Sequence, residues 1–119
     1  GAALEKRLEA LRALPWEAFA SRLEQAWRRE GYQVARFDGA GADYELSKAG
    51  RSTLVACKRW KASRTGVEPL RELAAAAKAR GAAEGRYLAL GEVTDTARDF
   101  AAGNALTLLG GAELAKLLR

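Results

Sequence analysis

The sequence contains no histidine and a single cysteine, Cys57. The absence of histidine excludes Ser-His catalytic triads, zinc-finger ligand pairs and metal nucleases that depend on histidine. One cysteine alone forms no disulfide within the chain and no cluster of metal ligands, so a reducing compartment is expected. Any catalysis must therefore use carboxylates, lysine or tyrosine.

Methionine is also absent, and the first residue is glycine. We therefore expect the sequence to be a piece of a longer protein that carries further domains. No apolar run approaches the ~20 residues that a membrane-spanning helix needs, and no signal-peptide pattern is present. Together with the lone cysteine, these absences predict a cytoplasmic domain.

What the sequence does contain is apolar residues and positive charge. It has 119 residues, of which 49% are hydrophobic, which is enough for one domain with a substantial core. The formal net charge is +5. Such an excess favours polyanionic partners, although many basic domains bind none.

Hydrophobic periodicity divides the chain into a short leading segment and one main domain. Residues 1–14 have leucines at helical spacing and are expected to be a linker or an accessory helix, and residues 15–119 form the domain. An apolar helical stripe follows Pro15 and is predicted to be core; it contains Trp16, Phe19, Leu23, Ala26 and Trp27.

The remaining patterns predict strands first and then alternating helices and strands. We expect strands over 32–37, 86–90 and 105–109, a hairpin over 42–61, and helices over 70–80, from Thr94 onward and over 113–118. This order predicts an α/β fold with a mixed central sheet flanked by helices.

The hairpin carries charged residues where a strand would normally bury apolar ones. If Ala49 and Gly50 form a two-residue turn, the numbers of paired residues sum to 99, and Asp43 lies opposite Ala56. Lys58 then projects from the same face. A carboxylate and an amine would thus converge at one end of the hairpin, in a geometry suited to a metal ion and a phosphate.

A basic segment follows the hairpin, with Lys58, Arg59, Lys61 and Arg64 around a single aromatic residue, Trp60. Because no acidic residue interrupts it, we favour a DNA-binding face over a merely solvated one. Trp60 either stacks on a base or covers the sheet edge. Cys57 alternates away from Asp43, so its side chain is predicted to be core rather than a nucleophile.

These segments together resemble the catalytic domain of Mrr-type restriction endonucleases, a branch of the PD-(D/E)XK nuclease-like superfamily. The resemblance spans nearly the whole chain after Leu14. The motifs that carry it are Phe19 twelve residues before Gly31-Tyr32, Gly41-Ala42-Asp43, LVACKRWK over 54–61 and GVEPLREL over 66–73.

The resemblance implies a restriction-endonuclease-like fold with an αβββαβ core, DNA as substrate, and Mg²⁺-dependent phosphodiester hydrolysis. It assigns Asp43 to the metal, and it assigns Lys58 to the scissile phosphate and the attacking water. The backbone carbonyl of Cys57 is implied as a further metal ligand. Hard oxygen ligands suit Mg²⁺, and lysine adds positive charge where the transition state becomes more anionic.

Several polar positions of the family are apolar here. Relatives carry Gln or Glu where this chain has Ala56, which offers no ligand. The first-helix glutamate falls on Ala20, a threonine pair on Ala89-Leu90 and a late aspartate on Gly110. These losses predict that Mg²⁺-dependent hydrolysis is weak or lost, while the domain still binds DNA.

Two alternatives remain open from the sequence. One is an active endonuclease that uses Asp43, Lys58 and a relocated carboxylate from Glu45, Glu17 or Glu24, although Glu45 lies on the side away from Lys58. The other is a protein-interaction scaffold, in which Asp43 and Lys58 form a simple ion pair. The expected partners are DNA, a second copy of the chain and further domains of a longer protein, in a bacterial cytoplasm.

Overall fold

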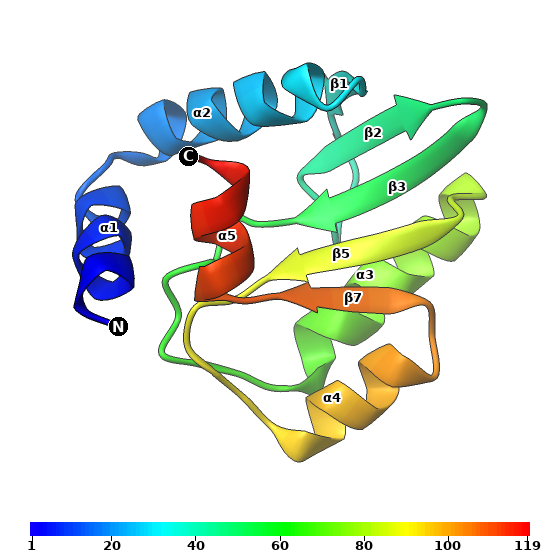
Figure 1. The fold of residues 1–119 in the computed structure, drawn as a ribbon. Coiled ribbons are helices and arrows are strands. Elements are labelled where there is room, and N and C mark those ends of the chain that lie inside the picture. Colours follow the sequence, from blue (N-terminus) through cyan, green and yellow to red (C-terminus); the bar gives the residue numbers. More distant parts are fainter.

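A five-stranded sheet forms the centre of the fold in the computed structural model, which describes residues 1–119 (Figure 1). The strands lie side by side in the order β1-β2-β3-β5-β7. Their bounds are β1 (Gln33–Arg36), β2 (Tyr44–Lys48), β3 (Arg51–Ala56), β5 (Glu84–Leu88) and β7 (Leu106–Leu109). The first two pairings are antiparallel and the last two are parallel, which confirms the predicted mixed sheet.

Helices cover both faces of this sheet; Figure 1 shows α3 behind it and α5 in front. The bounds are α1 (Ala2–Arg12), α2 (Trp16–Arg29), α3 (Val67–Arg80), α4 (Asp95–Ala102) and α5 (Gly111–Leu117). One apolar cluster joins α1, α2 and α5 to the sheet, and a second joins α3 and α4 to it. None of these helices has both the length and the apolar character that crossing a membrane requires.

The predicted hairpin is present with the predicted register. Ala49 and Gly50 both have positive φ, at 53° and 76°, which is typical of a two-residue type I′ turn. Tyr44 pairs with Val55 and Glu45 with Leu54, so the paired numbers sum to 99. The turn chemistry therefore fixes which residues of β2 and β3 share a face.

The aromatic stripe of α2 forms much of the first cluster. Phe19, Leu23 and Trp27 are all buried, as the periodicity predicts. Trp16, at the start of the helix, is only partly buried. Ala20, the position to which the resemblance assigns a glutamate, is completely buried, so its methyl group is part of the core.

The segment before Pro15 packs on the domain. Leu8 and Leu11 of α1 are buried in the first cluster. The guanidinium of Arg7 donates a hydrogen bond of 2.7 Å to the carbonyl of Ala115 in α5. The α1 helix therefore contributes to the core through its contact with α5.

Some element boundaries differ from the sequence-based expectation. Helix α3 begins at Val67 rather than 70, because Pro69 falls in the first turn, where no backbone hydrogen bond is lost. Strand β5 lies two residues before the expected one and contains Gly85. A Cβ at Gly85 would come within 2.7 Å of Leu106, so only glycine allows this close packing. Because glycine is uncommon inside strands, its presence hides the strand in the sequence pattern.

The sequence did not predict two further strands. They are β4 (Arg64–Thr65) and β6 (Glu92–Val93), which form a separate two-stranded parallel sheet. Each has only two residues, which is too short for an alternating pattern to be visible.

Candidate functional site

A hollow of about 280 Å³ lies at the end of the β2–β3 hairpin opposite the turn. Its lining includes Asp43, Ala56 and Lys58, the three residues that the hairpin register placed on one face. Arg59, Glu72 and Tyr87 also line it. The structure therefore brings together the residues that the sequence singled out, and we call this cavity the Asp43 hollow.

The carboxylate of Asp43 holds the end of β3 in place. Its Oδ2 accepts hydrogen bonds from the backbone N–H groups of Cys57, at 2.7 Å, and Lys58, at 2.9 Å. Both bonds end on Oδ2, which leaves Oδ1 for a further partner. Asp43 is thus already a structural residue before any ligand is considered.

Lys58 contacts Asp43 through its backbone, whereas its side chain is directed elsewhere. The ammonium Nζ lies 5.6 Å from the centroid of the Trp16 ring at the start of α2. Lys58 is exposed. An exposed, flexible lysine next to a hollow is free to meet a phosphate.

The two residues before Lys58 contribute little side-chain chemistry. Ala56 is buried and offers only a methyl group to the hollow. Cys57 is 1% exposed within the first cluster, and burial raises the pKa of its thiol well above the usual value. The prediction that Cys57 is a core residue is confirmed by this position. Its carbonyl accepts a hydrogen bond of 3.3 Å from the N–H of Trp60.

Glu72, which no sequence pattern indicated, lines the Asp43 hollow from α3. The loop before Asp43 packs tightly against this helix, because Gly41 has a φ of +90° and no side chain. A Cβ at Gly41 would lie 2.5 Å from the carbonyl oxygen of Glu72. The glycine in Gly41-Ala42-Asp43 is the only sequence signal for this contact, and it does not say which helix is approached.

None of the three glutamates considered as relocated ligands lines the hollow. Glu45 forms hydrogen bonds of 2.9 to 3.2 Å with Arg80, whose guanidinium lowers the pKa of Glu45. Glu17 and Glu24 both bind Arg36, at 2.9 and 3.0 Å. Each of these carboxylates is therefore occupied by an arginine of the protein itself.

The basic segment after Lys58 is divided between exposed and fixed side chains. Arg59 is exposed at the edge of the Asp43 hollow. Arg64 is exposed too, with its guanidinium 4.0 Å from Glu92. The Nζ of Lys61 donates a hydrogen bond of 2.6 Å to the carbonyl of Arg12, at the end of α1. Lys61 therefore also has a structural task.

Trp60 is a core residue. Its side chain is 2% exposed and stacks on Phe19, with ring centroids 3.9 Å apart and the planes 6° from parallel. This packing leaves little of the ring accessible, so the structure does not support the predicted contact of Trp60 with DNA. A tryptophan among cations looks like a ligand contact in sequence, and only the packing of α2 shows that it is buried.

A second hollow adjoins the first and shares Lys58 and Arg59 with it. Its volume is about 470 Å³. Trp16 and Lys61 also line it, and none of its lining residues is acidic. We call this cavity the Trp16 hollow.

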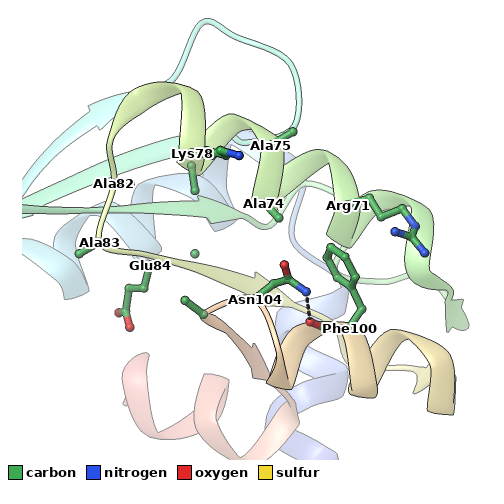
Figure 2. A pocket seen from close by; sticks show the side chains of 12 residues that line it. Arg71, Ala74, Ala75, Lys78, Ala82, Ala83, Glu84, Phe100 and Asn104 are labelled. Atoms are coloured by element: carbon green, nitrogen blue, oxygen red, sulfur yellow. Dashed lines mark hydrogen bonds between the residues drawn. The ribbon is translucent and has the colours of Figure 1, made fainter.

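Another hollow, of about 450 Å³, lies between α3, α4 and the start of β5 (Figure 2). Figure 2 shows alanines of α3 and of the following loop along its wall, with Asn104 bonded to the carbonyl of Phe100 at 2.8 Å. Its carboxylate, Glu84, binds Arg86 at 3.2 Å. This hollow contains none of the residues that the sequence analysis selected, so it is not the candidate site.

A comparison against protein families identifies the family of the whole domain. The family model Mrr_cat, described as a restriction endonuclease, matches residues 11–118. The chain belongs to this family. The resemblance found in the motifs is thereby confirmed, and Asp43 and Lys58 lie within the matched range. No curated protein matches the sequence.

Two solved structures share the fold. The restriction endonuclease MspJI, in complex with a 27-mer oligonucleotide, is 20% identical with a TM-score of 0.56, over 98% of this chain and 30% of the MspJI chain. The crystal structure of AF1548, a protein of unknown function, is 14% identical with a TM-score of 0.55, over 74% of this chain and 54% of the other. The present chain thus spans about a third and about half of these proteins.

The family uses Mg²⁺, and the residues of the Asp43 hollow fit this ion only in part. No group of three or more His, Cys, Asp or Glu side chains is placed to hold a metal. Asp43 and Glu72 supply two carboxylates, and Asp43 already accepts two backbone hydrogen bonds. Mg²⁺ is commonly held by one or two carboxylates together with substrate phosphates. The hollow therefore offers two carboxylates, which suffice for Mg²⁺ only if phosphates of a substrate supply further ligands.

Proposed function

We propose that this Mrr-type domain binds DNA across the two adjoining hollows, and that its Mg²⁺-dependent hydrolysis of phosphodiesters is weak or lost. The observation that carries this proposal is the position of Ala56. It lies in the Asp43 hollow together with Asp43 and Lys58. At this position the family resemblance implies a Gln or Glu side chain that binds the metal. The frame of the site is kept, and its central ligand is replaced by a methyl group.

DNA binding is supported by the charge around the hollows. Lys58 and Arg59 line both cavities, and Arg64 is exposed on the neighbouring small sheet. Cations on one surface bind DNA mainly by displacing counterions from phosphates. MspJI, which has the same fold, is bound to an oligonucleotide. We therefore assign Lys58, Arg59, Arg64 and the backbone-bound Lys61 to the DNA-binding surface.

Weak or lost hydrolysis follows from the donor set. When bound, Mg²⁺ would polarise the scissile phosphate and lower the pKa of a water ligand. In this chain Asp43 would hold the ion through the oxygen that its backbone contacts leave open, and Lys58 would neutralise the phosphate. The second side-chain ligand is absent at Ala56, and one lone pair of the Cys57 carbonyl oxygen is already used in a hydrogen bond.

The binding proposal is tested by titrating a fluorescent duplex with the domain at several salt concentrations. We expect the affinity to fall as salt rises, and Arg59→Ala and Arg64→Ala each to reduce the slope of log K against log salt by about 1. Arg51→Ala is the matched control, because Arg51 is exposed at the turn end of the hairpin, away from both hollows. Absence of binding at low salt would overturn the proposal and leave the scaffold interpretation.

A second candidate function is an active endonuclease in which Glu72 takes the role of the missing ligand. The observation that favours it is that Glu72 lines the same hollow as Asp43 and Lys58, which the three previously considered glutamates do not. In this case Glu72→Gln would abolish nicking and would also weaken Mn²⁺ binding measured by calorimetry. Glu68→Gln is the control, because Glu68 is an exposed glutamate one turn earlier on α3 that does not line the hollow. If Glu72→Gln changes neither quantity, this candidate is excluded.

A further inference from the structure

The three tryptophans of the chain differ in exposure, and only one of them is accessible enough to contact a ligand. Trp27 and Trp60 are each 2% exposed, and both are packed against other aromatic rings. Trp16 is only partly buried and lines the Trp16 hollow. Its ring centroid is 6.2 Å from that of Phe19, which ties it to the core. Trp16 is thus an anchored aromatic ring that still reaches a cavity.

The chemistry of the Trp16 hollow fits a nucleotide. Three cationic residues, Lys58, Arg59 and Lys61, line it, and no carboxylate does. The Nζ of Lys58 lies over the Trp16 ring, 5.6 Å from its centroid. A base that stacks on this ring displaces the exposed lysine, which then stays close enough to bind the phosphate of the same nucleotide. A charged lysine above an aromatic ring marks a surface that favours both a phosphate and a π-system.

We propose that Trp16 is a stacking platform for an unpaired DNA base whose phosphate is bound by Lys58. The Asp43 and Trp16 hollows share Lys58 and Arg59, so a strand that crosses both would present a phosphate and a base to adjoining sites. Base–aromatic stacking with a basic groove is the usual way to bind single strands. The inference rests on the proposed DNA binding, and it specifies single-stranded or locally unpaired DNA as the preferred ligand.

A paired base would not reach this platform. In a duplex the bases are stacked inside the helix, and a protein that contacts the face of a base must use single-stranded DNA or extrude the nucleotide. The cations of the hollow would bind phosphates of either form. The contribution of Trp16 is therefore separable from that of the cations, because it depends on an accessible base.

The test compares an oligothymidylate with an abasic oligonucleotide of the same length, so that the phosphates are equal and only the bases differ. We expect the wild-type domain to bind the oligothymidylate about tenfold or more tightly than the abasic strand, and to show quenched tryptophan fluorescence only with the former. Trp16→Leu, which keeps an apolar side chain, should remove both the preference and the quenching. Trp16→Phe should retain part of the preference.

Arg59→Ala serves as the matched control, because it should weaken binding of both strands by the same factor. A thermal melt of each variant checks that it is folded. Equal wild-type affinity for the two strands would overturn the inference. A Trp16→Leu variant whose affinities for both strands fall by the same factor would also overturn it. Failure of the proposed function differs from this result, because then neither strand nor a duplex binds at low salt.

Discussion

Asp43 and Glu45 are two residues apart on the same side of the sheet, yet the structure uses them in different ways. Asp43 accepts hydrogen bonds from the backbone of Cys57 and Lys58 and lines a hollow. Glu45 forms a two-pronged ion pair with Arg80 at the far end of α3. One carboxylate organises the strand end beside a cavity, and the other is neutralised by a side chain of the protein.

Two side chains on the same face of a sheet need not belong to the same site. The β-strand alternation of side chains places both carboxylates toward α3. The two carboxylates differ in the part of α3 that they approach. Glu45 binds Arg80 at the end of the helix. Asp43 lies nearer its beginning, where the loop that carries Gly41 packs against Glu72. The hollow lies beside the carboxylate that no arginine binds, because Asp43 accepts only backbone hydrogen bonds.

The largest expected difference between the two carboxylates concerns stability. Asp43→Ala leaves two backbone N–H groups without an acceptor, so we expect the free energy of unfolding to fall by about 2–3 kcal/mol. Chemical denaturation measures this loss. Asp43→Asn, which retains an acceptor oxygen, should lose less. A loss for Asp43→Ala no larger than that for Glu45→Ala would contradict the assigned role.

The thiol of Cys57 provides a local probe of the same contact. In the native protein the thiol is buried and its pKa is raised by burial, so a thiol reagent should label it slowly. Asp43→Ala should accelerate labelling about tenfold or more, because opening of the strand end becomes easier. Glu45→Ala should leave the rate within about twofold. Equal acceleration by both variants would remove the distinction between the two carboxylates.

A smaller effect on stability is expected for Glu45→Ala. Its partner Arg80 is 58% exposed, so solvent screens the ion pair and we expect a loss of about 1 kcal/mol or less. A double-mutant cycle with Arg80→Ala isolates the interaction. A coupling energy several times larger would show that this ion pair, rather than Asp43, is the main electrostatic support of the hairpin.

The smallest effect is a dependence of stability on pH. The hydrogen bond from Arg80 lowers the pKa of Glu45 from its ordinary value of 4.5. The stabilisation is therefore complete above that value and is lost as pH falls through the lowered pKa of the folded state. The wild type and Glu45→Gln should differ in melting temperature at neutral pH and converge in acid. A difference that grows in acid would contradict this sign.

The sequence predicted the frame of the site well, because local rules determine it. The Ala49-Gly50 turn fixes the hairpin register, and that register places Asp43, Ala56 and Lys58 together. The mixed sheet and most of its helices followed from periodicity and from the family motifs. The start of a helix at Thr94 was also predicted, and the Thr94 hydroxyl caps that helix by accepting a hydrogen bond of 3.1 Å from the N–H of Ala97.

The occupants of the site were harder to predict, because they come from distant segments. The approach of Glu72 depends on how a loop packs against α3, and the burial of Trp60 depends on Phe19 of α2. The sequence pattern ranks Trp16 and Trp60 in the opposite order, because Trp16 belongs to an apolar helical stripe and Trp60 lies among cations. Long side chains near a sheet edge are placed by tertiary packing, which a single sequence pattern does not encode.

The central claim, that the frame is kept and the ligand lost at Ala56, is tested most directly by Mg²⁺-dependent nicking of a supercoiled plasmid. Wild type, Ala56→Glu and Lys58→Ala would be compared side by side, with folding checked by thermal melting. We predict that the wild type nicks slowly or not at all, and that Ala56→Glu nicks much faster than the wild type. Wild-type nicking that is lost in Lys58→Ala and is not increased by Ala56→Glu would contradict the claim.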